Sequence, residues 1–193
     1  MPVVQPDPSY DYTAKIKPAT VRWVMPGWSY RSAASVVLAS GYVHYIPIFV
    51  SEPTTYIRIG IDVSAAGAGG TLARLGIYAW NNGVPGALIL DAGTVAIDAI
   101  AQVEIVISQL LQRGYYFLAI VCNDANAACN GPNDSSMVTC PVSGVNGANT
   151  YLFGVVLSIS GQVAQVAGGL SNPAVAPNAL QVANYAVVKL REN

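Results

Sequence analysis

Short segments in which apolar and polar side chains alternate are the feature that most constrains how this chain can fold. Residues 55–63 place Ile57, Ile59, Ile61 and Val63 on one predicted face and Tyr56, Arg58 and Asp62 on the other. Residues 72–80 repeat the pattern, with Ala73, Leu75, Ile77 and Ala79 opposite Arg74, Tyr78 and Trp80. Successive side chains of a strand point to opposite faces, so both segments are predicted to be half-buried β-strands.

Further segments extend this prediction along the chain. Strands are expected near 87–90 and 94–97, and at 103–107, 114–121, 151–157 and 183–190. Residues 81–86 predict a turn, and the Asn-, Ser-, Gly- and Pro-rich residues 123–149 predict the longest loop. A helical turn over 105–112 is the alternative to a strand followed by a turn. Many short strands separated by turn residues predict an all-β fold, an antiparallel β-sandwich of the jelly-roll type.

The first 20 residues have a different composition from the rest. They contain Pro2, Pro6, Pro8 and Pro18, with Tyr10, Tyr12, Lys15 and Lys17 between them. Proline lacks a backbone donor and fixes φ, so residues 1–20 are predicted to be an extended arm without regular structure of its own. The β-sandwich domain is then expected to comprise residues 21–193.

Charge is scarce in this chain and excludes some classes of protein. Nine Lys and Arg residues stand against ten Asp and Glu residues, only 10% of positions are charged, and the net charge is −1. A nucleic-acid-binding surface needs clustered basic residues, so no nucleic-acid partner is expected. The 53% hydrophobic content also excludes a disordered chain. A soluble protein with so little charge is expected to have part of its surface covered by partners.

One long uncharged stretch indicates which part of the surface the partners cover. No Asp, Glu, Lys or Arg occurs from Ser135 to Val188. Interface cores are depleted of charge, so much of this stretch is expected to lie between subunits of a homotrimer, with 151–157 and parts of 160–179 near the contacts. Compositional drift in an Ala-, Val- and Asn-rich gene is the alternative explanation.

No membrane segment or export signal is predicted. Residues 32–51 are uncharged, but Ser, Gly, His and Pro interrupt them and their period is two, so they do not suit a spanning helix. The N-terminus lacks the basic start and apolar core of a signal peptide, which predicts synthesis in the cytoplasm without export by that route. The three cysteines, Cys122, Cys129 and Cys140, match no zinc motif and are expected to be buried or loop thiols, with a Cys129–Cys140 bridge as the alternative.

The sequence offers no catalytic constellation. His44 is the single histidine, and no Gly-x-Ser-x-Gly motif supports it as the base of a serine hydrolase. Gly67–Leu72 lacks the third glycine of a dinucleotide-binding loop. Asp124 and Asp134 lie among asparagines and could bind Ca²⁺, but bending of the loop through their side chains is the favoured interpretation. We therefore expect no enzyme activity, no metal and no cofactor.

Several segments resemble a β-sandwich module common in virion proteins of tailed bacteriophages. They are Ala73-Arg74-Leu75-Gly76-Ile77-Tyr78, Asn82-Gly83-Val84-Pro85-Gly86-Ala87-Leu88, Asp91-Ala92-Gly93-Thr94-Val95, Tyr45-Ile46-Pro47, Ile57-Arg58-Ile59-Gly60-Ile61 and Gly114-Tyr115-Tyr116-Phe117-Leu118-Ala119. The resemblance covers about residues 41–121. It implies a structural protein of the virion, either a capsid decoration (cement) protein or a module at the end of a tail fibre or baseplate protein.

The N-terminal arm favours the decoration protein, because fibre modules usually follow a long shaft. The expected partner is the major capsid protein, and the expected location is the capsid surface of the virion. Capsid contacts are expected at the arm and at the aromatic residues after it: Tyr10, Tyr12, Lys15, Lys17, Trp23 and Trp28. The alternative is a receptor-binding module that contacts a host surface glycan through Trp80, Asn81, Asn82, Tyr115 and Tyr116.

Overall fold

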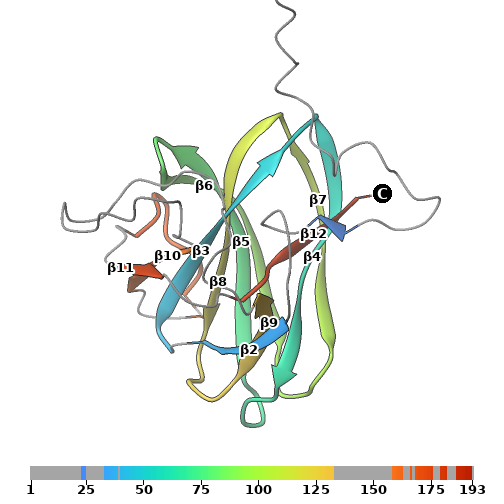
Figure 1. The fold of residues 1–193 in the computed structure, drawn as a ribbon, viewed down its shortest axis with the longest axis vertical. Coiled ribbons are helices and arrows are strands. Elements are labelled where there is room, and N and C mark those ends of the chain that lie inside the picture. The colour runs from blue at the N-terminus through green and yellow to red at the C-terminus, as the bar shows by residue number, and fades with distance from the viewer. Residues whose placement is uncertain are drawn as a thin grey trace, which may run out of the picture.

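The computed structural model describes residues 23–24, 33–38, 40–132, 158–162, 166, 168–175, 179–181 and 186–192. These residues form strands and no helix (Figure 1). The strands are β1 Trp23–Val24, β2 Ala33–Val37, β3 Tyr42–Val50, β4 Thr54–Ala65, β5 Leu72–Asn81, β6 Val84–Ala96, β7 Gln102–Leu111, β8 Gly114–Cys122, β9 Ala128–Pro132, β10 Ser158–Gln162, β11 Ala179–Gln181 and β12 Lys189–Glu192. No membrane-spanning helix occurs in this described part of the chain.

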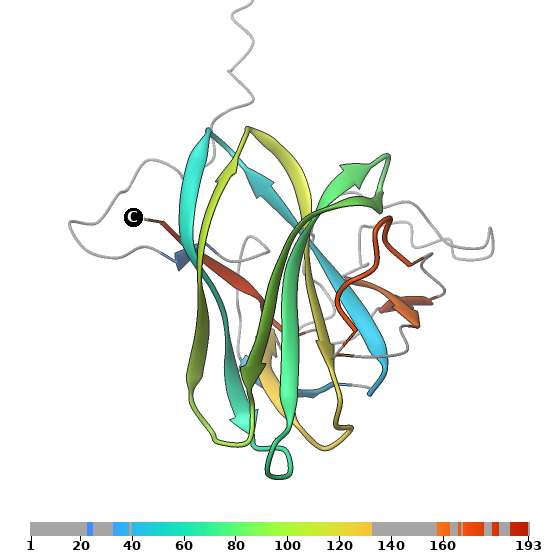
Figure 2. The same ribbon diagram turned by 180° about the vertical axis from the view of Figure 1, so that it is seen from behind.

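The strands form two antiparallel sheets that pack face to face (Figures 1 and 2). The first sheet has the order β1-β12-β4-β9-β2, and β7 pairs with the other edge of β4. The second sheet has the order β11-β10-β3-β8-β5-β6. The predicted all-β sandwich is confirmed. The jelly-roll connectivity is a finer assignment that stays a prediction.

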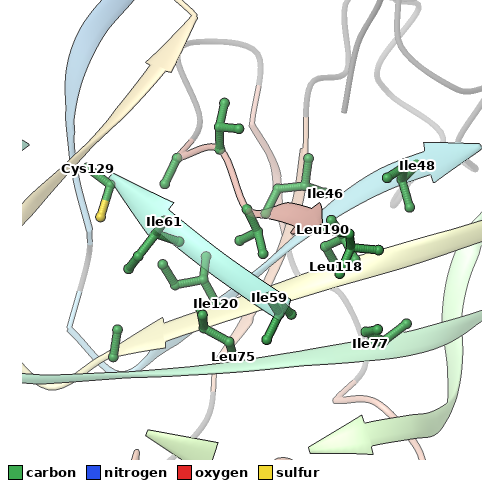
Figure 3. Packing of buried hydrophobic residues seen from close by; sticks show 14 of the residues in the cluster. Ile46, Ile48, Ile59, Ile61, Leu75, Ile77, Leu118, Ile120, Cys129 and Leu190 are labelled. Carbon is green, nitrogen blue, oxygen red and sulfur yellow. The ribbon is translucent and has the colours of Figure 1, made fainter. Parts of the chain in front are cut away.

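The main core lies between the two sheets. Ile59 and Ile61 of β4 point toward the second sheet, whose inward residues are fully buried isoleucines and leucines (Figure 3). These are Ile46 and Ile48 of β3, Leu75 and Ile77 of β5, and Leu118 and Ile120 of β8. Each buried side chain of this size contributes about 1.5–3 kcal/mol, so this layer supplies the main drive for the two sheets to pack.

The alternation in β5 predicts its two faces correctly. Ala73, Leu75 and Ile77 lie in the inter-sheet core, while Tyr78 belongs to a second cluster on the outer face of the sheet. The prediction for β4 is right for Ile59, Ile61 and Val63. It is wrong for Tyr56, which is buried in the core beside them, and for Ile57, which is only partly buried and lies outside the core cluster. The register of β4 shifts between Tyr56 and Arg58 against both neighbouring strands. Such a bulge reverses the faces of the residues before it.

The turn predicted over 81–86 is confirmed but is shorter than expected. Asn82 and Gly83 alone connect β5 to β6, and both have positive φ, 51° and 89°. An Asn-Gly pair suits a two-residue hairpin turn because both residues tolerate this conformation. The two short strands expected near 87–90 and 94–97 are one continuous strand, β6, whose register against β5 shifts at several points.

Four other segments differ from the sequence predictions or lie outside the described residues. Strand β7 confirms the strand predicted at 103–107 and excludes the helical turn, but it continues to Leu111, so the turn expected directly after the strand comes later. Strand β9 lies inside the predicted loop 123–149 and pairs with both β2 and β4. The strand predicted at 183–190 begins at Lys189 and ends at Glu192. The predicted strand 151–157 lies outside the described residues.

Candidate functional site

The outer face of the second sheet carries a second apolar cluster. Its strand residues are Val43 and Tyr45 of β3, Tyr78 of β5, and Phe117, Ala119 and Val121 of β8. Val166 and Leu170 pack onto these side chains. We call Val166 together with residues 168–175 the covering segment. It seals an apolar sheet face that would otherwise meet water.

An ion pair holds the covering segment in place. The Nε of Arg74 donates to both carboxylate oxygens of Asp91, at 2.8 and 3.0 Å. Arg74 also donates from Nη1 to the carbonyl of Val166 at 2.9 Å, and Asp91 accepts from the amide of Leu170 at 3.0 Å. Desolvation alone would raise the pKa of Asp91, but the hydrogen bonds from Arg74, Leu170 and Gly93 and the Arg74 charge outweigh it. The net pKa is lowered, so Asp91 stays ionised at neutral pH.

Backbone and hydroxyl contacts continue along the same segment. Tyr78 donates its hydroxyl to the carbonyl of Ser171 at 2.8 Å. The amide of Leu88 donates to Asn172 Oδ1 at 3.1 Å, and the amide of Ala174 donates to the Gly86 carbonyl at 2.9 Å. These bonds satisfy groups on β6, so the covering segment is joined to the edge of the sheet as well as to its face.

Beneath the covering segment, two tyrosines pack together. The rings of Tyr45 and Tyr78 meet edge to face with centroids 5.2 Å apart. Desolvation by burial raises the pKa of both phenols, and their closeness raises that of Tyr45 further. Both hydroxyls therefore remain protonated at neutral pH and are available as donors.

On the same outer face of the second sheet, four rings form a row across three neighbouring strands. Phe49 of β3 lies 4.8 Å from Tyr115 of β8, and Tyr115 lies 5.1 Å from Trp80 of β5. Trp80 stacks on Phe117 at 5.0 Å with an interplanar angle of 7°. We call these four residues the aromatic row. Their spacing follows the 4.7–4.9 Å separation of adjacent strands.

The geometry of the aromatic row limits what it can bind. Tyr115 of β8 has Phe49 of β3 on one side and Trp80 of β5 on the other, and both of these contacts are tilted. Trp80 contacts Tyr115 and Phe117, both of β8, and its stack on Phe117 covers one face of the indole ring. Stacking on a sugar needs a free ring face, whereas contact with another protein can use ring edges.

The five glycan-contact candidates do not form one surface. Trp80 and Tyr115 lie together in the aromatic row, and Asn81 and Asn82 are exposed at the adjacent β5–β6 turn. Tyr116 lies on the opposite face of β8, where it packs against the inter-sheet core and donates its hydroxyl to the Gln112 carbonyl at 3.0 Å. Phe49 and Phe117 were missed by sequence reasoning, because only the strand pairing brings them beside Trp80 and Tyr115.

Of the six capsid-contact candidates, only Trp23 is described. It lies on β1, paired with Arg191 of β12, and its ring lies 4.8 Å from the Nζ of Lys189. Lys189 has a side chain only 7% exposed and binds both carboxylate oxygens of Asp62, at 2.6 and 2.7 Å. Trp23 is therefore part of the sandwich itself. Tyr10, Tyr12, Lys15, Lys17 and Trp28 lie outside the described residues.

The outer face of β7 is the most exposed apolar surface among the described strands. Val106 is 71% exposed and Leu110 is 52% exposed. Both alternate with the inward residues of β7. They are exposed because successive side chains of a strand point to opposite faces, and not because they lie in a loop. Exposed apolar side chains that share one strand face are typical of contact surfaces.

The remaining candidates from the sequence have structural roles. Asp124 accepts hydrogen bonds from the amides of Ala68 and Asn126 and from the hydroxyl of Thr71 at 3.1 Å, so it joins the Gly67–Leu72 loop to the end of β8. This agrees with the loop-bending interpretation, while Asp134 lies outside the described residues. Among those residues, no group of three His, Cys, Asp or Glu side chains is placed to hold a metal ion.

The sulfur and imidazole groups lie away from the surface. Cys122 and Cys129 are buried thiols, and desolvation raises the pKa of Cys129 to about 12. Cys140 lies outside the described residues. His44 lies on β3 with its Nε2 atom buried and without a hydrogen-bond partner in the described structure, and desolvation lowers its pKa. These groups are neutral at pH 7 and belong to the interior of the sandwich.

Comparisons of the chain with protein-family models and with curated proteins found no match.

Proposed function

We propose that this chain is a structural protein of a bacteriophage virion, a capsid decoration protein that attaches to the major capsid protein and assembles as a homotrimer. The proposal rests on the resemblance of residues 41–121 to phage virion modules. It includes the jelly-roll connectivity and a location on the outer surface of the capsid, after synthesis in the host cytoplasm. No catalytic step, metal or cofactor enters it.

The observation that supports a protein-contact role best is the exposed apolar face of β7. Val106 and Leu110 are 71% and 52% exposed on a chain in which only 10% of residues are charged. Burial of such side chains against another protein is favourable by about 25 cal/mol per Å² of apolar surface. A surface of this kind suits attachment to a neighbouring protein better than it suits catalysis.

The second candidate is the glycan-binding module, and one observation favours it. The exposed amides of Asn81 and Asn82 lie next to Trp80, and amide and aromatic groups together are common in sugar sites. The stack of Phe117 on one face of Trp80 weighs against it, because that face cannot stack on a sugar. The decoration protein is therefore the function we propose first.

Binding of the purified full-length protein to undecorated phage capsids tests the proposal. Val106→Ser with Leu110→Ser should weaken binding by about tenfold or more, since two exposed apolar contacts are lost. Ile100→Ser is the matched control, because Ile100 is also 71% exposed but lies outside β7. Failure of the full-length protein to bind capsids, with binding to purified host surface glycan instead, would contradict the proposal and support the second candidate.

A further inference from the structure

One edge of β7 is unpaired among the described strands. Strand β7 pairs with β4 on one side, and none of the described strands pairs with its other side. The amide of Val63 donates to the Ala101 carbonyl at 2.8 Å, which sets the phase of this ladder. Hydrogen-bonded pairs alternate along an antiparallel ladder, so Val103 and Ile105 bond to β4. The amides and carbonyls of Gln102, Glu104 and Val106 therefore point to the free edge.

The side chains along this edge are incompletely covered. Val103, Ile105 and Ile107 point inward against the core but are only partly buried. On the outward side, Glu104 lies 3.3 Å from the Nε of Arg58 and 3.5 Å from Nη1 of Arg191, and the next outward residue, Val106, is 71% exposed. An added strand that fits would thus have an apolar inward face and an outward face that meets both a carboxylate and an apolar side chain.

The sequence of the N-terminal arm contains a stretch that fits this requirement. Residues 9–17, between Pro8 and Pro18, contain no proline and read Ser-Tyr-Asp-Tyr-Thr-Ala-Lys-Ile-Lys. One face of this stretch would carry Tyr10, Tyr12, Ala14 and Ile16, and the other Asp11, Thr13, Lys15 and Lys17. The pattern has a period of two, which is typical of a half-buried strand. Its length is close to the ten residues of β7.

We propose that residues 9–17 of a second copy of this chain add as a β-strand along the free edge of β7. Tyr10, Tyr12 and Ile16 would extend the inter-sheet core over Val103, Ile105 and Ile107. Lys15 and Lys17 would lie on the outward face, where Glu104 supplies a carboxylate. Main-chain hydrogen bonds give affinity in this mode of recognition, and the alternating side chains give specificity.

A second copy is a better source of the strand than the same chain. Trp23 lies on β1, and β12 and β4 separate β1 from β7. A return within one chain would have to cross ~19 Å of the outer sheet face, four strand spacings from β1 to the added strand, with only residues 18–22 as the connection. That face is occupied, because Trp23 lies over Lys189, and Arg58 pairs with Glu104. An arm from a neighbouring copy approaches the edge without this crossing.

Amide hydrogen exchange with the full-length protein tests the inference at single residues. The amides of Gln102, Glu104 and Val106 should exchange slowly in the oligomer. Thr13→Pro removes a donor from the middle of the added strand and should speed their exchange by about tenfold or more. The amides of Val103 and Ile105, which bond to β4, are the internal control and should not change. Gln5→Pro, outside residues 9–17, should behave as the unchanged protein.

Analytical ultracentrifugation of the same samples identifies the source of the strand. The inference requires the unchanged protein to be an oligomer and Thr13→Pro to dissociate, with an unchanged far-ultraviolet circular dichroism spectrum. Two results would overturn it: rapid exchange at Gln102, Glu104 and Val106 in the unchanged protein, or slow exchange there in a monomer, which would place the strand within one chain. The inference shares the oligomer with the proposed function but not the attachment to capsids. A monomer that still binds capsids would overturn the inference and leave the proposed attachment standing.

Discussion

Arg74 and Asp91 face each other across the β5–β6 pair, with the Nε of Arg74 2.8 and 3.0 Å from the two carboxylate oxygens of Asp91. Together they bind Val166 and Leu170, which lie 92 and 79 residues further along the chain from Arg74 and Asp91 respectively. A single ion pair thus fixes the covering segment on the outer face of the second sheet. The stability of that face should depend on it.

Asp91→Asn should lower the free energy of unfolding by about 2 kcal/mol, because hydrogen bonds to a charged group typically contribute 1.5–3 kcal/mol. Urea unfolding at pH 7 measures the effect. Asp98→Asn is the control, because Asp98 is exposed and accepts only a 3.3 Å bond from the Gly70 amide. Equal losses in the two variants would contradict the role of the ion pair.

The same carboxylate should make stability depend on pH at the acid end. The pKa of Asp91 is lowered in the folded protein, so its contribution is present above the unfolded pKa of about 4 and is lost as pH falls through the folded pKa. Urea unfolding between pH 5 and 2 should show a smaller decrease in Asp91→Asn than in the unchanged protein. Identical profiles would mean that Asp91 is not preferentially ionised in the folded state.

Gly76→Ala should destabilise the contact between β5 and the covering segment. A Cβ at this position would collide with the Cδ1 of Leu170 and would lie 2.7 Å from the Leu90 carbonyl oxygen. Overpacking of this kind costs about 1–3 kcal/mol. Gly69→Ala is the matched control, since nothing lies within 4 Å of its added Cβ. Thermal unfolding compares the two, and an equal change in both would reject the close approach of Leu170.

Lys189 and Asp62 should show strong coupling in a double-mutant cycle. Asp62→Asn leaves the Lys189 ammonium, 7% exposed, without its bidentate carboxylate, and should cost about 1–3 kcal/mol, less than a fully buried pair because Asp62 is 35% exposed. Lys189→Met in the Asp62→Asn background should restore part of this loss. Additive effects in urea unfolding would show that the pair is not coupled.

His44→Gln should leave capsid binding intact and change only the pH dependence of stability. Desolvation lowers the pKa of His44 in the folded protein, so the unfolded chain binds the proton more readily below its pKa of about 6.5. The unchanged protein should lose stability as pH falls from 7 to 5, and the glutamine variant should lose less. A hydrolase activity that disappears with this substitution would instead contradict a structural role.

Local patterns predict the strands well where the pairing is regular. The faces of β5 follow from its alternation, and the Asn82-Gly83 turn follows from residues that tolerate positive φ. The bulge beside Tyr56 was not predictable, because it depends on how β7 and β12 pair with β4. Strand β9 was missed because its polar sequence gains strand structure only through pairing with β2 and β4.

The candidate site was predicted less well than the fold. Trp80 and Tyr115 could be chosen as exposed aromatics, but their partners Phe49 and Phe117 come from strand register. Arg74 and Asp91 look like ordinary outward charges in the sequence, and only the return of the chain near Leu170 gives them a role. Contacts between distant segments carry no local signal.

Because the covering segment packs on β3, β5 and β8, substitutions in these distant parts of the chain should depend on one another during evolution. A related chain that shortened or lost residues 166–175 would expose Tyr45, Tyr78 and Phe117 to water, so compensating polar substitutions would be needed on β3, β5 and β8. Conversely, a bulkier residue at position 76 would select for a smaller one at position 170. Insertions should be tolerated at the Asn82-Gly83 hairpin tip but selected against in this segment.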